Sequence, residues 1–492
     1  MMEQLEVALP KLSASFPRKR ESTLNPSLNV KLDSRLRGND GYAWRRVNYV
    51  GLLAALAGLL SLWLPVVVVH PSRVAPAGDA YSLSALPPGW AVWLATAWIA
   101  FAAASMIRSG TVRTLAMAIA APATAVGHVA LLTWGAAGLA GQDEFARLSV
   151  ASGGWSGIVA VYIAFFSVRE ESQWLLPLQL AAVAAALLFA PFGHLGVVRE
   201  YMATADAFHA EFIRHCSLVC ATLPLVILIG FALGVFAVRK PRVESAVLGL
   251  AGFLQTIPSV ALFGLLLPVL SAYGRHLTVG GVVMCGALFV IAAIVGWRFL
   301  KRWDVPVAGV LYGLLVAAGI VLLLPAAGSM LYQLVSQGWP WLAQARWSST
   351  LDTLGVRGLG VTPAIVALTL YGLWPLVVNT HAGLKSVPAG TVEAAKGMGM
   401  SARQVFWHVE IPIAAPFFIQ GVRGALLLLI GLTTIAVLVN AGGLGYFLMR
   451  GTEQAVPDLV LLGALPVVAL ALATDGVTRL LAWALMPKGL RP

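Results

Sequence analysis

Charged residues are scarce in this sequence of 492 residues: Asp, Glu, Lys and Arg make up only 11%, whereas 59% of the residues are hydrophobic. A typical soluble domain is about a quarter charged, because a globule needs a largely polar exterior. The mean hydropathy is +0.84. The composition excludes a soluble enzyme, a disordered scaffold and a nucleic-acid-binding domain, and it indicates a polytopic membrane protein.

Cysteine is also rare. Cys216, Cys220 and Cys285 lie in apolar segments without a CxxC pair, so no disulfide framework is expected. No His/Asp/Glu cluster has the spacing of a metal site, which argues against a bound metal and a membrane-embedded enzyme. The phosphate-binding pattern G-x-x-x-x-G-K-[ST] is missing. We therefore expect no cofactor on this chain and any ATP to be hydrolysed on another polypeptide.

Long apolar runs dominate the sequence. A membrane-crossing helix needs about 20 mostly apolar residues, and the short alternating runs of membrane β-barrels are not the pattern here. We expect an all-α fold with about 12 transmembrane helices. The predicted spans are residues 47–69, 89–107, 114–138, 153–168, 174–192, 216–238, 244–270, 278–297, 306–331, 361–380, 411–440 and 459–486.

The net charge of +12 comes from basic residues that are concentrated before residue 47 and in alternate loops. With the N-terminus inside, the cytoplasmic segments hold most of the Lys and Arg residues, even without the first 46 residues. The positive-inside rule then places both termini in the cytoplasm. Residues 193–215 become an external segment, for which we expect an amphipathic helix.

The cytoplasmic loop at residues 381–410 is the longest informative one. It predicts two short helices: Ser386 is expected to cap the first, Gly397 and Gly399 to end it. The segment Ser401–Gln404 predicts a capping box for the second. A small helix rich in Ala and Gly and flanked by basic residues suits docking into a groove of another protein; an ordinary helical loop fits the same pattern.

The string Glu393-Ala394-Ala395-x3-Gly399-x9-Val409-x-Ile411-Pro412 resembles the EAA motif of ABC-importer permeases, EAA-x3-G-x9-I-x-L-P. Val for Ile and Ile for Leu are mild departures, and the spacing matches throughout. The resemblance implies a coupling helix that is seated in a cleft of an ATPase subunit. The residues expected to take part in this coupling are Glu393, Ala394, Ala395, Gly399, Arg403, Ile411 and Pro412.

Three further segments, residues 255–264, 362–371 and 440–445, resemble the permeases of importers for glycine betaine, choline and related osmoprotectants. Residues 198–201 and the five leading spans resemble the long form of these permeases, which has extra N-terminal helices. The resemblance implies a type I importer core in the bacterial inner membrane. It also implies separate partners: an ATPase that holds ATP and Mg, a periplasmic or lipid-anchored solute-binding protein, and a second permease copy or paralogue.

The domain layout follows from these segments. Residues 1–46 are polar and basic and resemble in part a translated genomic repeat element, which predicts a disordered tail or a mis-called start. Residues 47–192 are expected to form five accessory helices, and residues 216–492 the permease core. The core contains the coupling loop and an inserted helix pair at about residues 278–331.

Polar residues within the spans are few. Gln255, Thr256 and Ser259 around Pro258 can line a pathway through opened backbone, or belong to a proline-kinked packing helix. A second candidate site lies near the outer end of the span at residues 411–440. It predicts an external gate or a tight turn, formed by Asn440, Gly442 and Gly443.

Arg423 and Asp475 lie at a depth where charges are costly and usually paired, so we expect a structural ion pair between them. An ion-gradient-driven secondary transporter of small polar solutes is the alternative function. It is disfavoured because such transporters normally need more carboxylates or histidines within the spans than this chain has.

Overall fold

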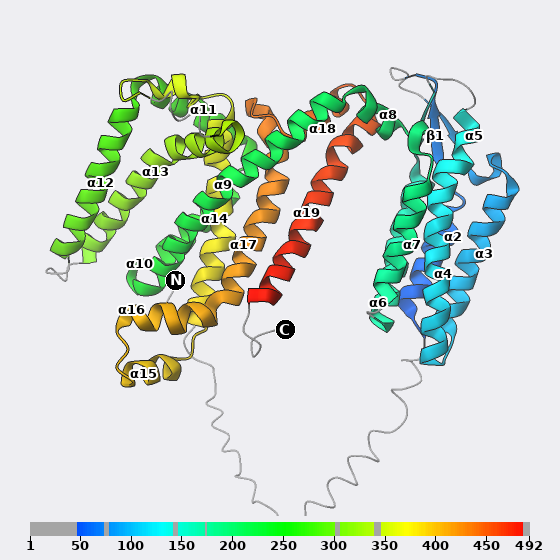
Figure 1. Cartoon of the computed structure of the whole chain (residues 1–492), viewed down its shortest axis with the longest axis horizontal. Helices are drawn as coiled ribbons and strands as arrows, with labels where there is room; N and C mark the ends of the chain where they lie inside the picture. The colour runs from blue at the N-terminus through cyan, green and yellow to red at the C-terminus, as the bar shows by residue number, and fades with distance from the viewer. Residues whose placement is uncertain are drawn as a thin grey trace, which may run out of the picture. The chain divides into compact units, whose positions relative to one another are not determined.

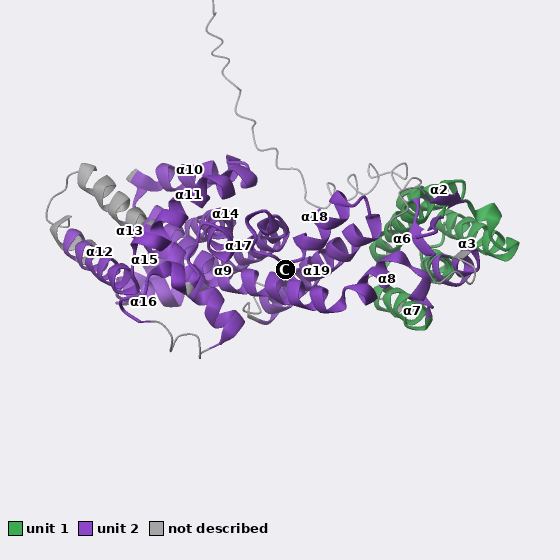
Figure 2. Ribbon diagram, turned by 90° about the horizontal axis from the view of Figure 1, so that it is seen from above, with its two compact units in different colours: residues 1–66, 82–131, 152–189 green, residues 67–81, 132–151, 190–492 purple. Residues whose placement is uncertain are grey.

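The computed structural model describes residues 47–72, 78–140, 146–172, 175–300, 306–338 and 346–485. The chain forms two compact units (Figure 2). The first comprises residues 1–66, 82–131 and 152–189, and the second comprises residues 67–81, 132–151 and 190–492. The predicted tail, residues 1–46, lies outside the described residues.

The first unit is a helix bundle that is packed around Trp98, Phe101 and Met117, all with no exposed surface. Alanines and glycines surround them and let the helices approach closely; a Cβ on Gly58 would lie 2.1 Å from the Trp98 ring. His128 is buried against the edge of the same ring. The helices are α2 (Tyr49–Ser61), α3 (Pro88–Met106), α4 (Gly110–Ala130), α6 (Ser152–Glu171) and α7 (Leu176–Phe189).

The first predicted span, residues 47–69, is too long. The helix α2 ends at Ser61, and Val67–His70 forms the strand β1. Pro65 lacks an N–H group for helical hydrogen bonding, and the four valines that follow it are β-branched and favour a strand. An apolar run therefore continues past the end of the helix.

A small antiparallel sheet belongs to the second unit and has the order β2-β1-β3, with β2 at Asp79–Tyr81 and β3 at Arg147–Val150. Two polar contacts fix β3 within this unit. Arg147 forms an ion pair with the buried Glu200, and the Ser149 hydroxyl donates to Asp458, 2.5 Å away.

The centre of the second unit is α14, which packs between α9 and α17 and buries most of its length. Glycines let these helices approach: Cβ atoms on Gly230 and Gly372 would lie within 3 Å of Leu376 and Val226. The helices are α5 (Ala136–Ala140), α8 (Gly196–Ala203), α9 (Ala205–Arg239), α10 (Pro241–Thr256), α11 (Ser259–His276), α12 (Val279–Leu300), α13 (Pro306–Gln337), α14 (Val361–Lys385), α15 (Ala389–Gly397), α16 (Ala402–Val405), α17 (Ile411–Thr433), α18 (Gly445–Glu453) and α19 (Pro457–Leu485).

The predicted external segment, residues 193–215, is divided between two helices. Residues 196–203 form α8, and α9 begins at Ala205, well before the predicted start of its span at residue 216. Figure 1 shows α15 and α16 at one end of the second unit and α11 and α18 at the opposite end. We call these the α15 end and the α18 end.

Among the described residues, six helices are long and apolar enough to cross a membrane, or seven if the bent pair α10–α11 is one span. Shorter apolar helices include Tyr49–Ser61, Gln179–Phe189 and Val279–Ala292. The fold is thus that of an all-α polytopic membrane protein with one small sheet. The count of twelve spans stays a prediction.

Candidate functional site

The chain turns a sharp corner between α10 and α11, where the two helices bend by 100°. Pro258 has no N–H to donate and disfavours helical backbone in the residue before it. Ile257 accordingly lies in the extended region, with φ −69° and ψ 125°. The sequence predicted one span over residues 244–270 that is interrupted at Pro258; the structure has two helices that meet at this proline.

Tyr371 on α14 forms hydrogen bonds at this corner, one of them with a carbonyl group that the break in the helix leaves without a helical partner. Its hydroxyl donates to the carbonyl oxygen of Ile257 at 2.5 Å, and its own carbonyl accepts a hydrogen bond from the Gln255 amide at 2.6 Å. The Thr256 hydroxyl donates locally to the carbonyl of Phe253. The sequence predicted the polar residues at the corner but did not reveal Tyr371, because the contact joins positions more than 100 residues apart.

The second predicted site, at residues 440–445, is a tight turn between the 3-10 segment Thr434–Val439 and α18. Asn440, Gly442 and Gly443 have φ values of 61°, 77° and 95°, a region that glycine tolerates and asparagine adopts more readily than other residues. Asn440 is exposed, whereas the rest of the turn is packed inside the protein: Ala441 and Leu444 are 1% and 0% exposed.

Two side chains of α9 hold this turn, and the sequence did not reveal either of them. The Glu211 carboxylate accepts the N–H of Gly443 at 2.6 Å, and the buried His215 accepts the N–H of Leu444 at 3.4 Å. A Cβ on Gly442 would lie 2.4 Å from the Arg214 side chain. The glycines therefore permit α9 to close over the turn. The two predicted sites border the same hydrophobic core. Phe263, which follows the Pro258 corner, and Ala441, which lies in the turn, belong to one buried cluster.

The predicted coupling loop has two short helices, as the sequence indicated. Ser401 and Gln404 form a reciprocal capping box at the start of α16, which confirms that part of the prediction. The Ser386 prediction is wrong: Ser386 closes α14, with its hydroxyl donating to the carbonyl of Gly383, and Pro388 occupies the N-cap position of α15. Because Ser386 has helical backbone angles, its side chain turns back to the preceding helix.

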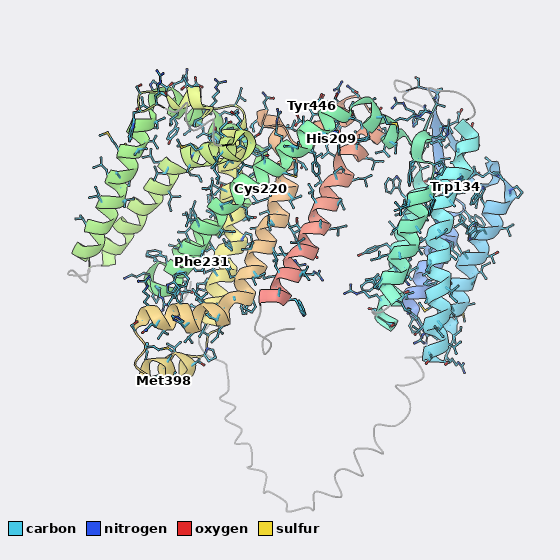
Figure 3. The ribbon with its side chains drawn as sticks, in the orientation of Figure 1. Trp134, His209, Cys220, Phe231, Met398 and Tyr446 are labelled. Carbon is cyan, nitrogen blue, oxygen red and sulfur yellow. The ribbon has the colours of Figure 1, made fainter. Side chains whose placement is uncertain are left out.

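Most of α15 faces solvent. Ala395 is 2% exposed, whereas Glu393 and Ala394 are exposed. Met398, labelled at the α15 end in Figure 3, has 73% of its surface exposed. The helix ends at Gly397, and Gly399, which follows the C-cap residue Met398, has a left-handed φ of 84°. The helix α15 therefore presents a small, nearly free surface at one end of the second unit.

Charged contacts join the predicted coupling loop to the helices beside it. Arg239 at the end of α9 forms an ion pair with Glu410, and its guanidinium lies 5.4 Å from the centre of the Phe406 ring. On the other side, the Glu244 carboxylate at the start of α10 accepts from His381 at 2.9 Å and from Lys385 at 2.5 Å. Both His381 and Lys385 lie in the last turns of α14, directly before the loop.

The last two long helices are joined by charge. Arg423 on α17 forms an ion pair with Asp475 on α19, and Arg479 reaches the other oxygen of the same carboxylate at 2.9 Å. The Arg423 and Asp475 side chains are 24% and 23% exposed. The contact crosses between helices and joins α17 to α19.

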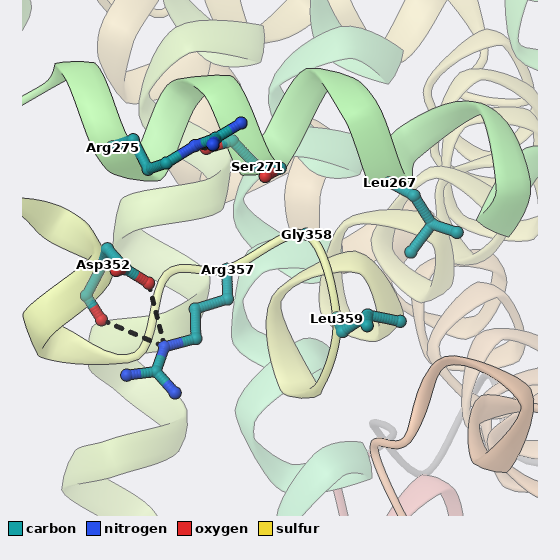
Figure 4. Close-up of a pocket in the computed structure, with 7 residues that line it drawn as sticks. All are labelled: Leu267, Ser271, Arg275, Asp352, Arg357, Gly358 and Leu359. Carbon is teal, nitrogen blue, oxygen red and sulfur yellow. Dashed lines mark hydrogen bonds and ion pairs between the residues drawn. The ribbon is translucent and has the colours of Figure 1, made fainter.

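A cavity of about 440 Å³ opens at the α18 end, between α11 and the segment before α14 (Figure 4). Arg275, Arg357 and Asp352 line it, and Arg357 donates to the Asp352 carboxylate at 2.9 Å. Among the described residues, no group of three or more His, Cys, Asp or Glu side chains can hold a metal ion.

The sequence matches two families. Residues 226–485 match the family described as binding-protein-dependent transport system inner membrane component, and residues 45–197 match the N-terminal domain of ABC transporter permease YehY. The first match covers more than half of the chain. The chain therefore belongs to the inner-membrane permease family of binding-protein-dependent ABC transporters.

Two individual relatives and one solved structure are similar to this chain. The osmoprotectant import permease protein OsmW of Salmonella typhimurium is 31% identical over 56% of this chain and 91% of its own length. The carnitine transport permease protein OpuCB of Listeria monocytogenes is 39% identical over 27% of this chain and 62% of its own length. A solved structure of the MetNI methionine ABC transporter shares 16% identity over 56% of this chain and 94% of its own, with a TM-score of 0.34.

Proposed function

We propose that this permease couples to a separate ATPase through α15 and imports glycine betaine or a related osmoprotectant. The exposed α15, which carries the Glu393-Ala394-Ala395 string between two membrane-spanning helices, is the observation that carries the proposal. A short helix that buries only one of its side chains in this chain has a surface available for a groove in another protein. We assign to this contact Glu393, Ala394, Ala395, Gly399, Arg403, Ile411 and Pro412.

The charged contacts beside the loop supply a route for motion. Through Glu244, the end of α14 is joined to α10, which leads to the corner at Pro258. Through Arg239 and Glu410, α9 is joined to the start of the α16–α17 segment. A movement of α15 that accompanies ATP binding would shift these helices as packed elements rather than bend them.

The solute class follows from chemistry that the relatives' names share. Osmoprotectants, carnitine, choline and glycine betaine appear in those names, and the last three all carry a quaternary ammonium group. We propose that the solute passes the corner formed by Gln255, Thr256, Pro258 and Ser259. Asn440, Gly442 and Gly443 shape the opposite end of the route as a fixed turn.

The assembly has further members. We propose an ATPase that binds ATP and Mg, a periplasmic or lipid-anchored solute-binding protein at the α18 end, and a second copy or paralogue of this permease. The α15 end then faces the cytoplasm together with both termini, in the inner membrane. Residues 47–192 are accessory helices, and α12 and α13 are an insertion in the core.

The test is reconstitution. The full chain, co-expressed with its ATPase and its solute-binding protein, is placed in liposomes, and ATP-dependent uptake of radiolabelled glycine betaine is measured, with choline and carnitine as competitors. Uptake that needs ATP and stops on Glu393→Lys supports the proposal. Uptake that follows an ion gradient without ATP, or a Glu393→Lys complex with normal ATPase binding and transport, would refute the coupling role.

A further inference from the structure

A cavity of about 520 Å³ lies at the α15 end, where α15 and α16 meet the end of α9. Two apolar segments long enough to span a membrane end here: one stops at Arg239, and the other begins at Ala402. Residues from the terminal turns of both line the cavity, so it lies at the depth of the membrane surface rather than in the hydrocarbon core.

The cavity carries excess positive charge. Arg239, Lys396 and Arg403 all line it, and Glu410 is the one acidic residue in its lining. Glu410 is engaged by Arg239. In the described part of the chain, neither Lys396 nor Arg403 has an ion-pair partner. Two positive charges therefore face one concave surface without compensation.

The remaining wall is apolar. Val235 of α9 and Phe406, which directly follows α16, line this side, and Val405 beneath them is only 2% exposed. A cationic rim beside an apolar wall matches an amphiphile with a negatively charged head, and basic pockets at the membrane surface bind anionic lipid headgroups in this way. An inorganic anion would use the rim but leave the apolar wall uncovered.

We propose that this cavity binds the phosphodiester headgroup of an anionic phospholipid. Lys396 and Arg403 contact the phosphate, Arg239 supports it, and the first acyl carbons lie on Val235 and Phe406. Because Lys396 belongs to α15, a bound lipid would hold this helix against the end of α9. That effect on coupling rests on the proposed function, whereas lipid binding itself needs no ATPase.

The experiment uses the full-length permease alone, purified in detergent. Native mass spectrometry measures the binding of added phosphatidylglycerol, phosphatidylcholine and, separately, inorganic phosphate. We expect phosphatidylglycerol to bind preferentially. Lys396→Gln with Arg403→Gln should weaken this binding roughly thirtyfold, since each basic residue near an anionic lipid surface contributes about a factor of five.

The matched control is Arg108→Gln with Arg169→Gln, which removes two exposed basic residues elsewhere in the chain and should leave phosphatidylglycerol binding unchanged. Lys396→Arg with Arg403→Lys should also retain it, because the charge is kept; size-exclusion profiles check that each variant is folded.

Three results would overturn the proposal: equal binding of phosphatidylcholine, equal occupancy by inorganic phosphate, or unchanged phosphatidylglycerol binding in the glutamine variant. Because Arg403 is also assigned to the ATPase contact, unchanged lipid binding in that variant overturns the lipid proposal whether or not the ATPase still co-purifies. The ATPase itself is tested separately by Glu393→Lys, so failure of one proposal is distinguishable from failure of the other.

Discussion

The hydroxyl oxygen of Tyr371 lies 2.5 Å from the carbonyl oxygen of Ile257, the residue at which α10 has stopped and α11 has not begun. Gln255 returns a hydrogen bond to the carbonyl of Tyr371. The corner at Pro258 is thus held by α14, the most buried long helix of the second unit. A broken helix can persist at membrane depth because protein groups satisfy its freed backbone.

Replacing Tyr371 with Phe tests this relationship. The change leaves the Ile257 carbonyl without its donor, which should cost about 1–3 kcal/mol of stability and lower the rate of solute uptake. Tyr273→Phe is the matched control, because its hydroxyl makes the same kind of bond to the carbonyl of Leu322 at 2.5 Å, away from the corner. Thermal unfolding and liposome uptake are measured for both. Equal loss of uptake in the two variants would show that the corner has no special role.

Gly399 offers a test of the proposed ATPase contact. It separates the effect of backbone conformation from the effect of an added side chain. Its φ is 84°, and a Cβ there would meet nothing within 4 Å. Gly399→Ala should therefore strain the end of α15 by about 1–2 kcal/mol and reduce ATPase binding. The matched control is Gly397→Ala, at a helical position where a Cβ also meets open space. It should preserve binding in a co-purification assay; if it is as harmful as Gly399→Ala, the added methyl group rather than the backbone is responsible.

The sequence predicted features that depend on neighbouring residues. The break at Pro258 and the capping box of Ser401 and Gln404 are examples, because a proline or a cap acts within one helical turn. Contacts between distant segments were not predictable: Glu211 meets Gly443 across 232 positions. The strand Val67–His70 was missed for another reason, since a run of valines is apolar enough to extend a predicted span.

Glu244 should act in coupling more than in stability. Its carboxylate is shared by His381 and Lys385, and the Lys385 side chain is 50% exposed, so solvent screens the ion pair and it contributes little to folding. Glu244→Gln should leave the thermal midpoint nearly unchanged and reduce the solute transported per ATP roughly twofold to thirtyfold, the range typical of residues that carry coupling between sites. The exchange Glu244→Lys with Lys385→Glu should restore part of this ratio. A large loss of stability without any change in the ratio would contradict the prediction.

Asp475, in contrast to Glu244, should act in stability more than in coupling. Asp475→Asn removes the counter-charge of Arg423, which is only 24% exposed, and an incompletely solvated guanidinium without its partner should cost about 1–3 kcal/mol. We expect a lower yield of folded protein, measured by fluorescence-detected size exclusion. Arg479→Gln is the control, because this side chain is 62% exposed and pairs with the same carboxylate from the next turn of α19, so its loss should change the yield little. If the Asp475→Asn protein has normal yield but does not transport, the carboxylate acts in translocation and the structural role is wrong.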